Sequence, residues 1–165
     1  MDTSTRLGLP LLAAGQAQKE LFHNEALAAI DLALHACVEA VGVDAPPADP
    51  RDGDCWIVGT APVGDWSGHA GAIAGWSTSG WRFLAPVEGM AVWNRAAEAF
   101  ARHVGGAWVT GRLTGAALVI GGDQVVGARQ PAIAAPQGGS TVDVEARATL
   151  AALLSAMRRH GLIEA

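Results

Sequence analysis

The chain has 165 residues and a mass of 16.8 kDa, the length of one ordinary domain or two very small ones. Half of the residues are hydrophobic and 16% are charged, which excludes an intrinsically disordered chain, while 21 glycines and 8 prolines argue against a simple helical bundle. The formal net charge of −5 leaves no basic field for a polyphosphate backbone, so we expect no nucleic-acid partner.

An apolar segment near the start, residues 7–14, ends in small residues like those of a secretory cleavage site. Asp2 weakens the positive charge that should precede such a signal, and Pro10 interrupts the short apolar run. No later segment approaches the roughly 18 apolar residues of a membrane-spanning helix. We therefore expect neither a signal peptide nor insertion into a membrane.

Apolar residues recur at helical spacing from Asn24 to Val41 and predict the first helix. Asn24 is a suitable N-cap, and Gly42 with the prolines after it ends the pattern. Residues 16–22 either add a turn to this helix or stay irregular.

Between Arg51 and Thr110, short apolar segments separated by glycines predict a small antiparallel sheet. The glycines of Ser79-Gly80 and Gly105-Gly106 supply the positive φ angles that tight hairpins need. We expect strands near Cys55–Val58, Ala72–Trp76, Trp81–Leu84, Met90–Asn94, Ala99–His103 and Trp108–Thr110.

All six tryptophans lie in this sheet region, and indole rings are enriched both in cores and at interaction sites. The first interpretation, that the rings fill a thin core, applies to Trp56, Trp81, Trp93 and Trp108. The second applies to Trp66 and Trp76, which flank a glycine-rich loop and would present flat faces to a sugar ring or a neighbouring subunit. His69 in that loop is a candidate contact residue.

The C-terminal third predicts a β-rich connector and a second helix. The segment Ala116–Gln130 is typical of β-structure, and residues 132–139 are rich in proline and glycine. The helix runs from Asp143, a good N-cap, to His160, and Gly161 stops it.

The apolar side of this second helix either packs on the sheet or joins copies of the chain, and we favour self-association. The oligomerisation residues expected there are Leu150, Leu153, Leu154 and Met157. The expected organisation is a domain of residues 1–113, a β-rich connector of residues 114–140 and a helical segment of residues 141–165.

Residue patterns that would indicate catalysis or metal binding are missing from the sequence. It contains no phosphate-binding glycine loop, serine elbow, HExxH or CxxC motif, and its five histidines are scattered. Asp49, Asp52 and Asp54 fit an Asp-Gly turn better than a calcium loop. Cys37 and Cys55 fit buried free thiols, with one disulfide as the alternative. We expect no catalytic residue, no metal and no cofactor.

A set of short motifs is spread over roughly residues 6–110. They are Leu7-Gly8-Leu9-Pro10, His23-Asn24-Glu25-Ala26-Leu27, Asp52-Gly53-Asp54, Gly64-Asp65-Trp66-Ser67-Gly68-His69 and Gly80-Trp81-Arg82-Phe83-Leu84-Ala85-Pro86-Val87-Glu88-Gly89. With these motifs the chain resembles a family of unassigned domains found in alphaproteobacterial prophages and gene transfer agents. The resemblance implies a component of a tail fibre or head spike, and it carries over no catalytic residue.

Fold and function expectations follow from these observations together. The fold is α+β: an N-terminal helix packed on a small Trp-rich antiparallel sheet, plus a C-terminal oligomerisation helix. The chain is expected to be a virion structural protein of a phage-like particle, the base or adaptor of a head spike or tail fibre that aids host attachment. Its expected partners are copies of itself in a trimer or pentamer, capsid or tail proteins, and a spike or fibre protein, assembled in the bacterial cytoplasm.

Two alternatives remain open at this point. The first is a carbohydrate-binding module that recognises a cell-surface polysaccharide through Trp66, His69 and Trp76. The second is a hydrolase of envelope glycans, which would draw its acid and base from Asp52, Asp54, Glu88 and His69.

Overall fold

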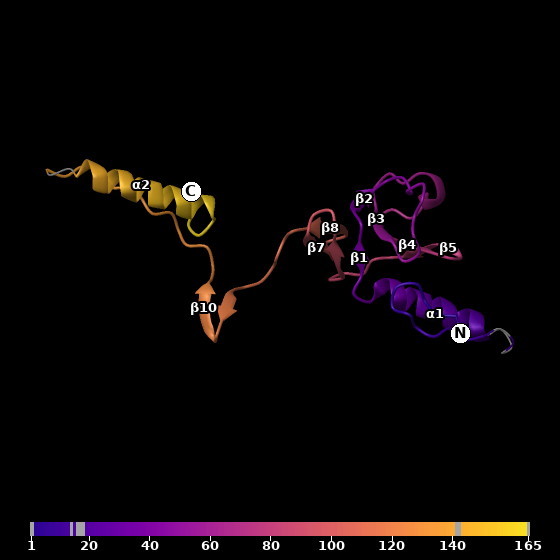
Figure 1. The fold of residues 1–165 in the computed structure, drawn as a ribbon. Coiled ribbons are helices and arrows are strands. Elements are labelled where there is room, and N and C mark those ends of the chain that lie inside the picture. The colour runs from indigo at the N-terminus through magenta and orange to yellow at the C-terminus, as the bar shows by residue number, and fades with distance from the viewer. Residues whose placement is uncertain (1, 14, 16–18, 141–142, 165) are drawn as a thin grey trace. The chain divides into compact units, whose positions relative to one another are not determined.

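The computed structural model describes residues 2–13, 15, 19–140 and 143–164. The chain divides into two compact units, Met1–Arg112 and Leu113–Ala165, called here the N-terminal unit and the C-terminal unit (Figure 1). Each unit contains a helix and β-strands, so the expected α+β class is confirmed.

The N-terminal unit combines one helix, a short 3-10 helix and two four-stranded sheets within the described residues. Its elements are α1 (Lys19–Ala33), β1 (Cys37–Val38), β2 (Val41–Val43), β3 (Cys55–Val58), η1 (Gly64–Trp66), β4 (Ile73–Ser77), β5 (Gly80–Leu84), β6 (Ala91–Asn94), β7 (Ala99–Val104) and β8 (Ala107–Thr110). The strand orders are β2-β3-β4-β5 and β1-β6-β7-β8. The pairs β2–β3 and β1–β6 are parallel, and the other pairs are antiparallel.

The six strands expected between Arg51 and Thr110 are all present, and none of their ends is displaced by more than one residue. Gly80, Gly105 and Gly106 have φ angles of 100°, 60° and 80°, as the expected hairpin turns require. The expectation of one antiparallel sheet is wrong, because the strands fall into two sheets and each sheet takes an additional parallel strand from residues 37–43.

The first helix differs from its prediction at both ends. It begins at Lys19, so Asn24 lies inside it, and it ends at Ala33, so Val38 and Val41 belong to strands. The three-residue spacing from Val38 to Val41 continues the helical pattern, but the two valines lie in separate strands whose backbone pairs with other parts of the chain. Just before β1, Trp93 N donates to Ala36 O. Of the uncertain turn at residues 16–22, residues 16–18 lie outside the described residues and the rest are helical.

Alternation along β3 separates two apolar clusters in the N-terminal unit. Cys55 and Ile57 point into the main core, while Trp56 and Val58 point into an aromatic cluster on the opposite face. The main core joins α1 to both sheets, and its other members are Leu32, Ala36, Val38, Ile73, Val92 and Ala101. Burial on both faces explains why β3 is apolar at every position.

Gly75 lets α1 lie directly on β4. A Cβ atom built at this position would be 2.6 Å from Leu32 Cδ1 and 3.5 Å from Cys55 Sγ. Because Leu32 is buried, its side chain has little room to move aside, so the missing Cβ sets the distance between the helix and the sheet.

The C-terminal unit consists of a β-hairpin, an extended segment and the second helix. The elements are β9 (Leu118–Ile120), β10 (Asp123–Val126) and α2 (Val144–Arg159). Asp143 Oδ1 accepts a hydrogen bond from Ala146 N, and Gly161 has a φ of 71°, so the expected helix start and stop are confirmed. Backbone bonds join Gln130 to Leu162 and Glu164, so the segment after the hairpin returns along the helix end.

Candidate functional site

The first residues of the chain are fixed to α1 through one buried carboxylate. Asp31 is 4% exposed and accepts hydrogen bonds from Ser4 Oγ (2.7 Å), Arg6 N (3.0 Å) and Leu7 N (2.7 Å). The Arg6 guanidinium donates in turn to the carbonyl oxygens of Asp31 and His35 at the end of the helix. Burying a polar group is costly unless it is hydrogen-bonded, and the three hydrogen bonds to the Asp31 carboxylate offset that cost.

Asn24, which lies on α1 nearer its N-terminus than Asp31, makes a second attachment between the helix and the N-terminal segment. Its Oδ1 accepts from Leu12 N at 2.9 Å, and its Nδ2 donates to Leu12 O at 3.1 Å. The side chain therefore does not cap the helix, as the sequence had suggested, but ties the N-terminal segment to it. The attachment of the N-terminal segment to α1 was not predicted from the sequence. The signal for it was Asp31, a charged residue between the apolar Ile30 and Leu32 of the helix.

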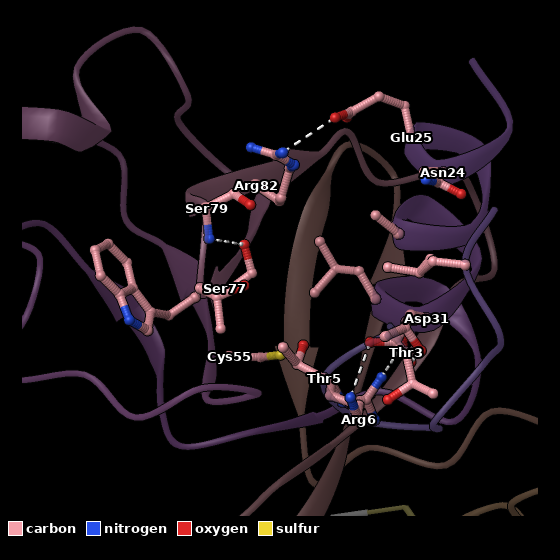
Figure 2. Close-up of a pocket in the computed structure, with 17 residues that line it drawn as sticks. Thr3, Thr5, Arg6, Asn24, Glu25, Asp31, Cys55, Ser77, Ser79 and Arg82 are labelled. Carbon is pink, nitrogen blue, oxygen red and sulfur yellow. Dashed lines mark hydrogen bonds and ion pairs between the residues drawn. The ribbon is translucent and has the colours of Figure 1, made fainter. Parts of the chain in front are cut away.

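A cleft of about 220 Å³ lies between the N-terminal segment, α1 and the turn that joins β4 to β5 (Figure 2). We call it the helix–turn cleft. Its floor is formed by Ala28, Leu32, Cys55 and Gly75, and its rim carries the polar groups of Thr3, Thr5, Asn24, Glu25, Ser77, Thr78, Ser79 and Arg82. An ion pair of 3.0 Å between Glu25 Oε1 and Arg82 Nη2 joins the helix to β5 across the rim.

The aromatic cluster on the other face of the sheet corrects two expectations about the tryptophans. Trp66 has no exposed surface and lies against Trp56 and Trp81, with ring centroids 6.1 Å and 5.1 Å away. A ring without accessible surface cannot stack on a sugar, so Trp66 fills the core. Trp93, expected in the core, is 38% exposed and packs edge to face on Phe100.

His69 and Trp76, the other two proposed contact residues, lie at different places. The His69 imidazole is exposed and stacks flat on the Phe83 ring, with centroids 3.7 Å apart. Trp76 lies at the helix–turn cleft, but its ring packs edge to face on Trp81 at 4.9 Å. The three residues therefore do not form one site, and of the three only Trp76 lines the helix–turn cleft.

The acid and base candidates are also distributed. Asp52 and Asp54 lie in a polar groove with Glu39 and Arg95, whereas neither Glu88 nor His69 lines it. Asp54 Oδ2 accepts from Arg51 N and Gly53 has a φ of 91°, which is the expected Asp-Gly turn. Both carboxylate oxygens of Glu88 accept from Gly105 N. Within the described ranges the proposed hydrolase residues are thus not assembled.

Both cysteines are free thiols in very different surroundings. Cys37 is half-buried in the polar groove, and its Sγ accepts from Arg95 Nε at 3.0 Å. The bond to Cys37 and the charge of Glu39 raise the pKa of the Arg95 guanidinium. Cys55 is fully buried in the main core, and this burial raises its pKa from 9.0 to about 11.

The raised pKa of Cys55 predicts a loss of stability in alkali. The folded protein keeps the thiol proton up to about pH 11, while the unfolded chain releases it near pH 9.0, so rising pH favours unfolding between these values. We expect the free energy of unfolding to fall by about 2–3 kcal/mol over this interval. Urea denaturation at pH values from about 8 to 10.5 measures most of this fall. Few other side chains titrate in this range, because the chain has no tyrosine and only one lysine.

The matched control is Cys55→Ala, which lowers stability at every pH but removes the thiol that titrates. We expect its free energy of unfolding to show a clearly weaker decline in alkali. Equal declines in the two proteins would contradict this assignment, because the decline would then come from groups other than Cys55.

The C-terminal unit leaves most of its apolar side chains uncovered. Every residue of β9 and β10 is exposed, and on α2 Leu150 is 46% and Leu153 55% exposed. Only Leu154 and Ile163 are buried among its described apolar residues. Of the four residues expected at a seam, Leu154 is already buried in the single chain and Met157 is half-buried, which leaves Leu150 and Leu153 for a partner.

The described residues contain neither a metal-binding cluster nor a membrane-spanning helix. No group of three or more His, Cys, Asp or Glu side chains could hold a metal ion. No described helix is both long and apolar enough to cross a membrane.

Comparisons with known proteins assign a family to most of the N-terminal unit. A search of curated proteins found no significant match. A known family, described as "Protein of unknown function (DUF2793)", matches residues 23–109, a range that includes most of α1 and both four-stranded sheets. Since this match covers more than half of the chain, the protein belongs to the DUF2793 family.

Proposed function

We propose that this protein is a structural subunit of a phage-like particle, and that it forms the base or adaptor of a head spike or tail fibre. Its work in this proposal is mechanical: it holds a spike or fibre protein to capsid or tail proteins and thereby aids host attachment. Assembly takes place in the bacterial cytoplasm. The motif resemblance to prophage and gene transfer agent domains supports a role in a phage-like particle. Membership of the DUF2793 family is consistent with this role.

The observation that carries the proposal is the uncovered apolar surface of the C-terminal unit. A two-stranded hairpin is marginally stable by itself in water, and here Leu118, Val119 and Ile120 are 53–62% exposed. Large exposed apolar patches mark interaction surfaces in proteins. A segment that buries so little of its own apolar surface gains stability by association.

A second copy of the same chain is the occupant that we favour for this surface. The unit contains equal numbers of positive and negative side chains. The positive ones are Arg129, Arg147, Arg158 and Arg159, and the negative ones are Asp123, Asp143, Glu145 and Glu164. Copies therefore approach without net repulsion. The proposal is a homo-oligomer, trimer or pentamer, that is joined through the C-terminal units.

The test is the presence of the chain in purified particles. Particles released from the producing bacterium are separated from soluble protein by density gradient, and their proteins are quantified by mass spectrometry. We expect this chain to sediment with the major capsid protein at a fixed ratio. A chain found only in the soluble fraction as a dispersed monomer would overturn the proposal.

A further inference from the structure

The helix–turn cleft is held open by contacts that are independent of any ligand. Asp31 fixes the N-terminal segment to α1 with three hydrogen bonds, and the Glu25–Arg82 ion pair fixes α1 to β5. On the third wall, Ser77 Oγ donates to Gly80 O and accepts from Ser79 N, which shapes the β4–β5 turn. Because each wall is attached to another or braced internally, the cleft is preformed, as most small-molecule sites are.

The charged groups at the cleft are already satisfied by protein partners. Asp31 accepts from three donors, Arg6 donates to backbone carbonyl oxygens, and Glu25 is paired with Arg82. Each charged side chain that lines the cleft therefore already has hydrogen-bond partners in the protein. A charged ligand would have to compete with these contacts.

The polar groups of the rim that are available to bind a ligand are hydroxyl groups. No hydrogen bond to another described residue occupies the hydroxyls of Thr5, Thr78 and Ser79, which border the cleft from two sides. A hydroxyl both donates and accepts, so a row of them matches a ligand whose own groups do both. On the floor below, the side chains of Ala28, Leu32 and Cys55 are apolar.

We propose that the helix–turn cleft binds one uncharged sugar ring. A pyranose has hydroxyls around its edge and C–H groups across its face, which suit the hydroxyl rim and the apolar floor. The cleft volume of 220 Å³ lies below the roughly 300–1,000 Å³ of sites for drug-sized ligands, so it suits a single ring. Trp76 is not the stacking platform, since its ring packs on Trp81. The site belongs to the N-terminal unit and does not require assembly.

Backbone amide NMR of the full-length protein tests this with glucose, galactose, mannose and N-acetylglucosamine as probes. We expect at least one of them to shift the amides of residues 24–28 and 77–79 saturably. A dissociation constant on the order of 1 mM is expected of a ligand with about twelve non-hydrogen atoms. Glucuronate and sorbitol, which add a charge or open the ring, are expected to bind at least about tenfold more weakly.

Two variants with matched controls locate the site. Ala28→Leu fills the floor and is expected to abolish the shifts, whereas Ala26→Leu on the exposed side of α1 leaves them unchanged. Thr78→Ala removes one rim hydroxyl in an exposed turn, where misfolding is not expected, and should weaken binding about tenfold. Thr110→Ala, exposed on β8, serves as its control.

Three results would overturn the proposal. The first is the absence of saturable shifts with all four neutral sugars, measured on a protein whose spectrum shows the folded N-terminal unit. The second is binding that maps to the aromatic face around His69 and survives Ala28→Leu and Thr78→Ala. The third is equal binding of glucuronate or sorbitol. None of these bears on the presence of the chain in particles, so the two proposals fail separately.

Discussion

The double substitution Leu150→Ser and Leu153→Ser is expected to dissociate the assembled protein into single chains. About half of each side chain is still exposed in the single chain, so its burial against a partner is worth about 1 kcal/mol. A symmetric trimer contains six such leucines, and their loss lowers its association constant by a factor of roughly 10⁴. Size-exclusion chromatography with light scattering measures the change as a fall in mass.

The matched control for this prediction lies on the opposite side of the same helix. Ala148→Ser and Ala152→Ser introduce the same residue at exposed positions, about 200° around the helix from Leu150 and about 140° and 100° from Leu153. Serine lowers helix propensity in both double variants by a similar amount, so fraying of α2 affects them alike. An unchanged mass for the leucine variant, or equal dissociation of both variants, would contradict a seam at Leu150 and Leu153.

Replacing Trp66 by alanine is expected to be the most destabilising change in the N-terminal unit. The side chain is completely buried between Trp56 and Trp81, so its removal leaves a cavity and breaks two aromatic contacts. Buried tryptophans typically cost about 3–5 kcal/mol when truncated, which is a large part of the roughly 5–15 kcal/mol that stabilises a domain. Urea denaturation followed by circular dichroism measures this without depending on indole fluorescence.

Trp93→Ala is the comparison that separates burial from residue type. Trp93 is 38% exposed and contacts Phe100 at the surface, so its truncation is expected to cost about 1 kcal/mol. Trp66→Phe, which keeps a ring in the cavity, is expected to lose less than Trp66→Ala. A loss at Trp66 no larger than that at Trp93 would show that the aromatic cluster is not a core.

Local sequence signals were sufficient for the strands of residues 55–110 and for the second helix. Glycine turns at Gly80 and Gly105 divide the apolar segments, and Asp143 with Gly161 defines the helix ends through capping chemistry that depends only on neighbouring residues. Such features can be read from the sequence because the partners lie within a few residues of each other.

The first helix was misplaced because its boundary depends on distant partners. Val38 and Val41 continue the apolar spacing of the helix, yet β1 pairs with β6 and β2 with β3, which lie far away in the sequence. Asn24 has the chemistry of an N-cap, but its amide pairs with Leu12 instead. Tertiary contacts override local propensity at both positions.

The candidate site was only partly predictable for the same reason. Trp76 was identified as a candidate from its place beside the glycine-rich loop, whereas Glu25, Arg82 and the Ser77–Ser79 turn come together only in the folded unit. The exposed fraction of each ring distinguishes tryptophans that fill the core from those that could contact a partner. Spacing along the sequence does not predict this fraction for a residue in a loop. Trp66, for example, lies in the 3-10 helix η1 and its side chain is buried.

The most direct test of the assembly role is the mass of the untreated full-length chain in solution. Sedimentation equilibrium over a wide range of dilution gives this mass without a label or a variant. The account predicts a single species of three or five times the 16.8 kDa of one chain. A stable 16.8 kDa monomer at every concentration would contradict it.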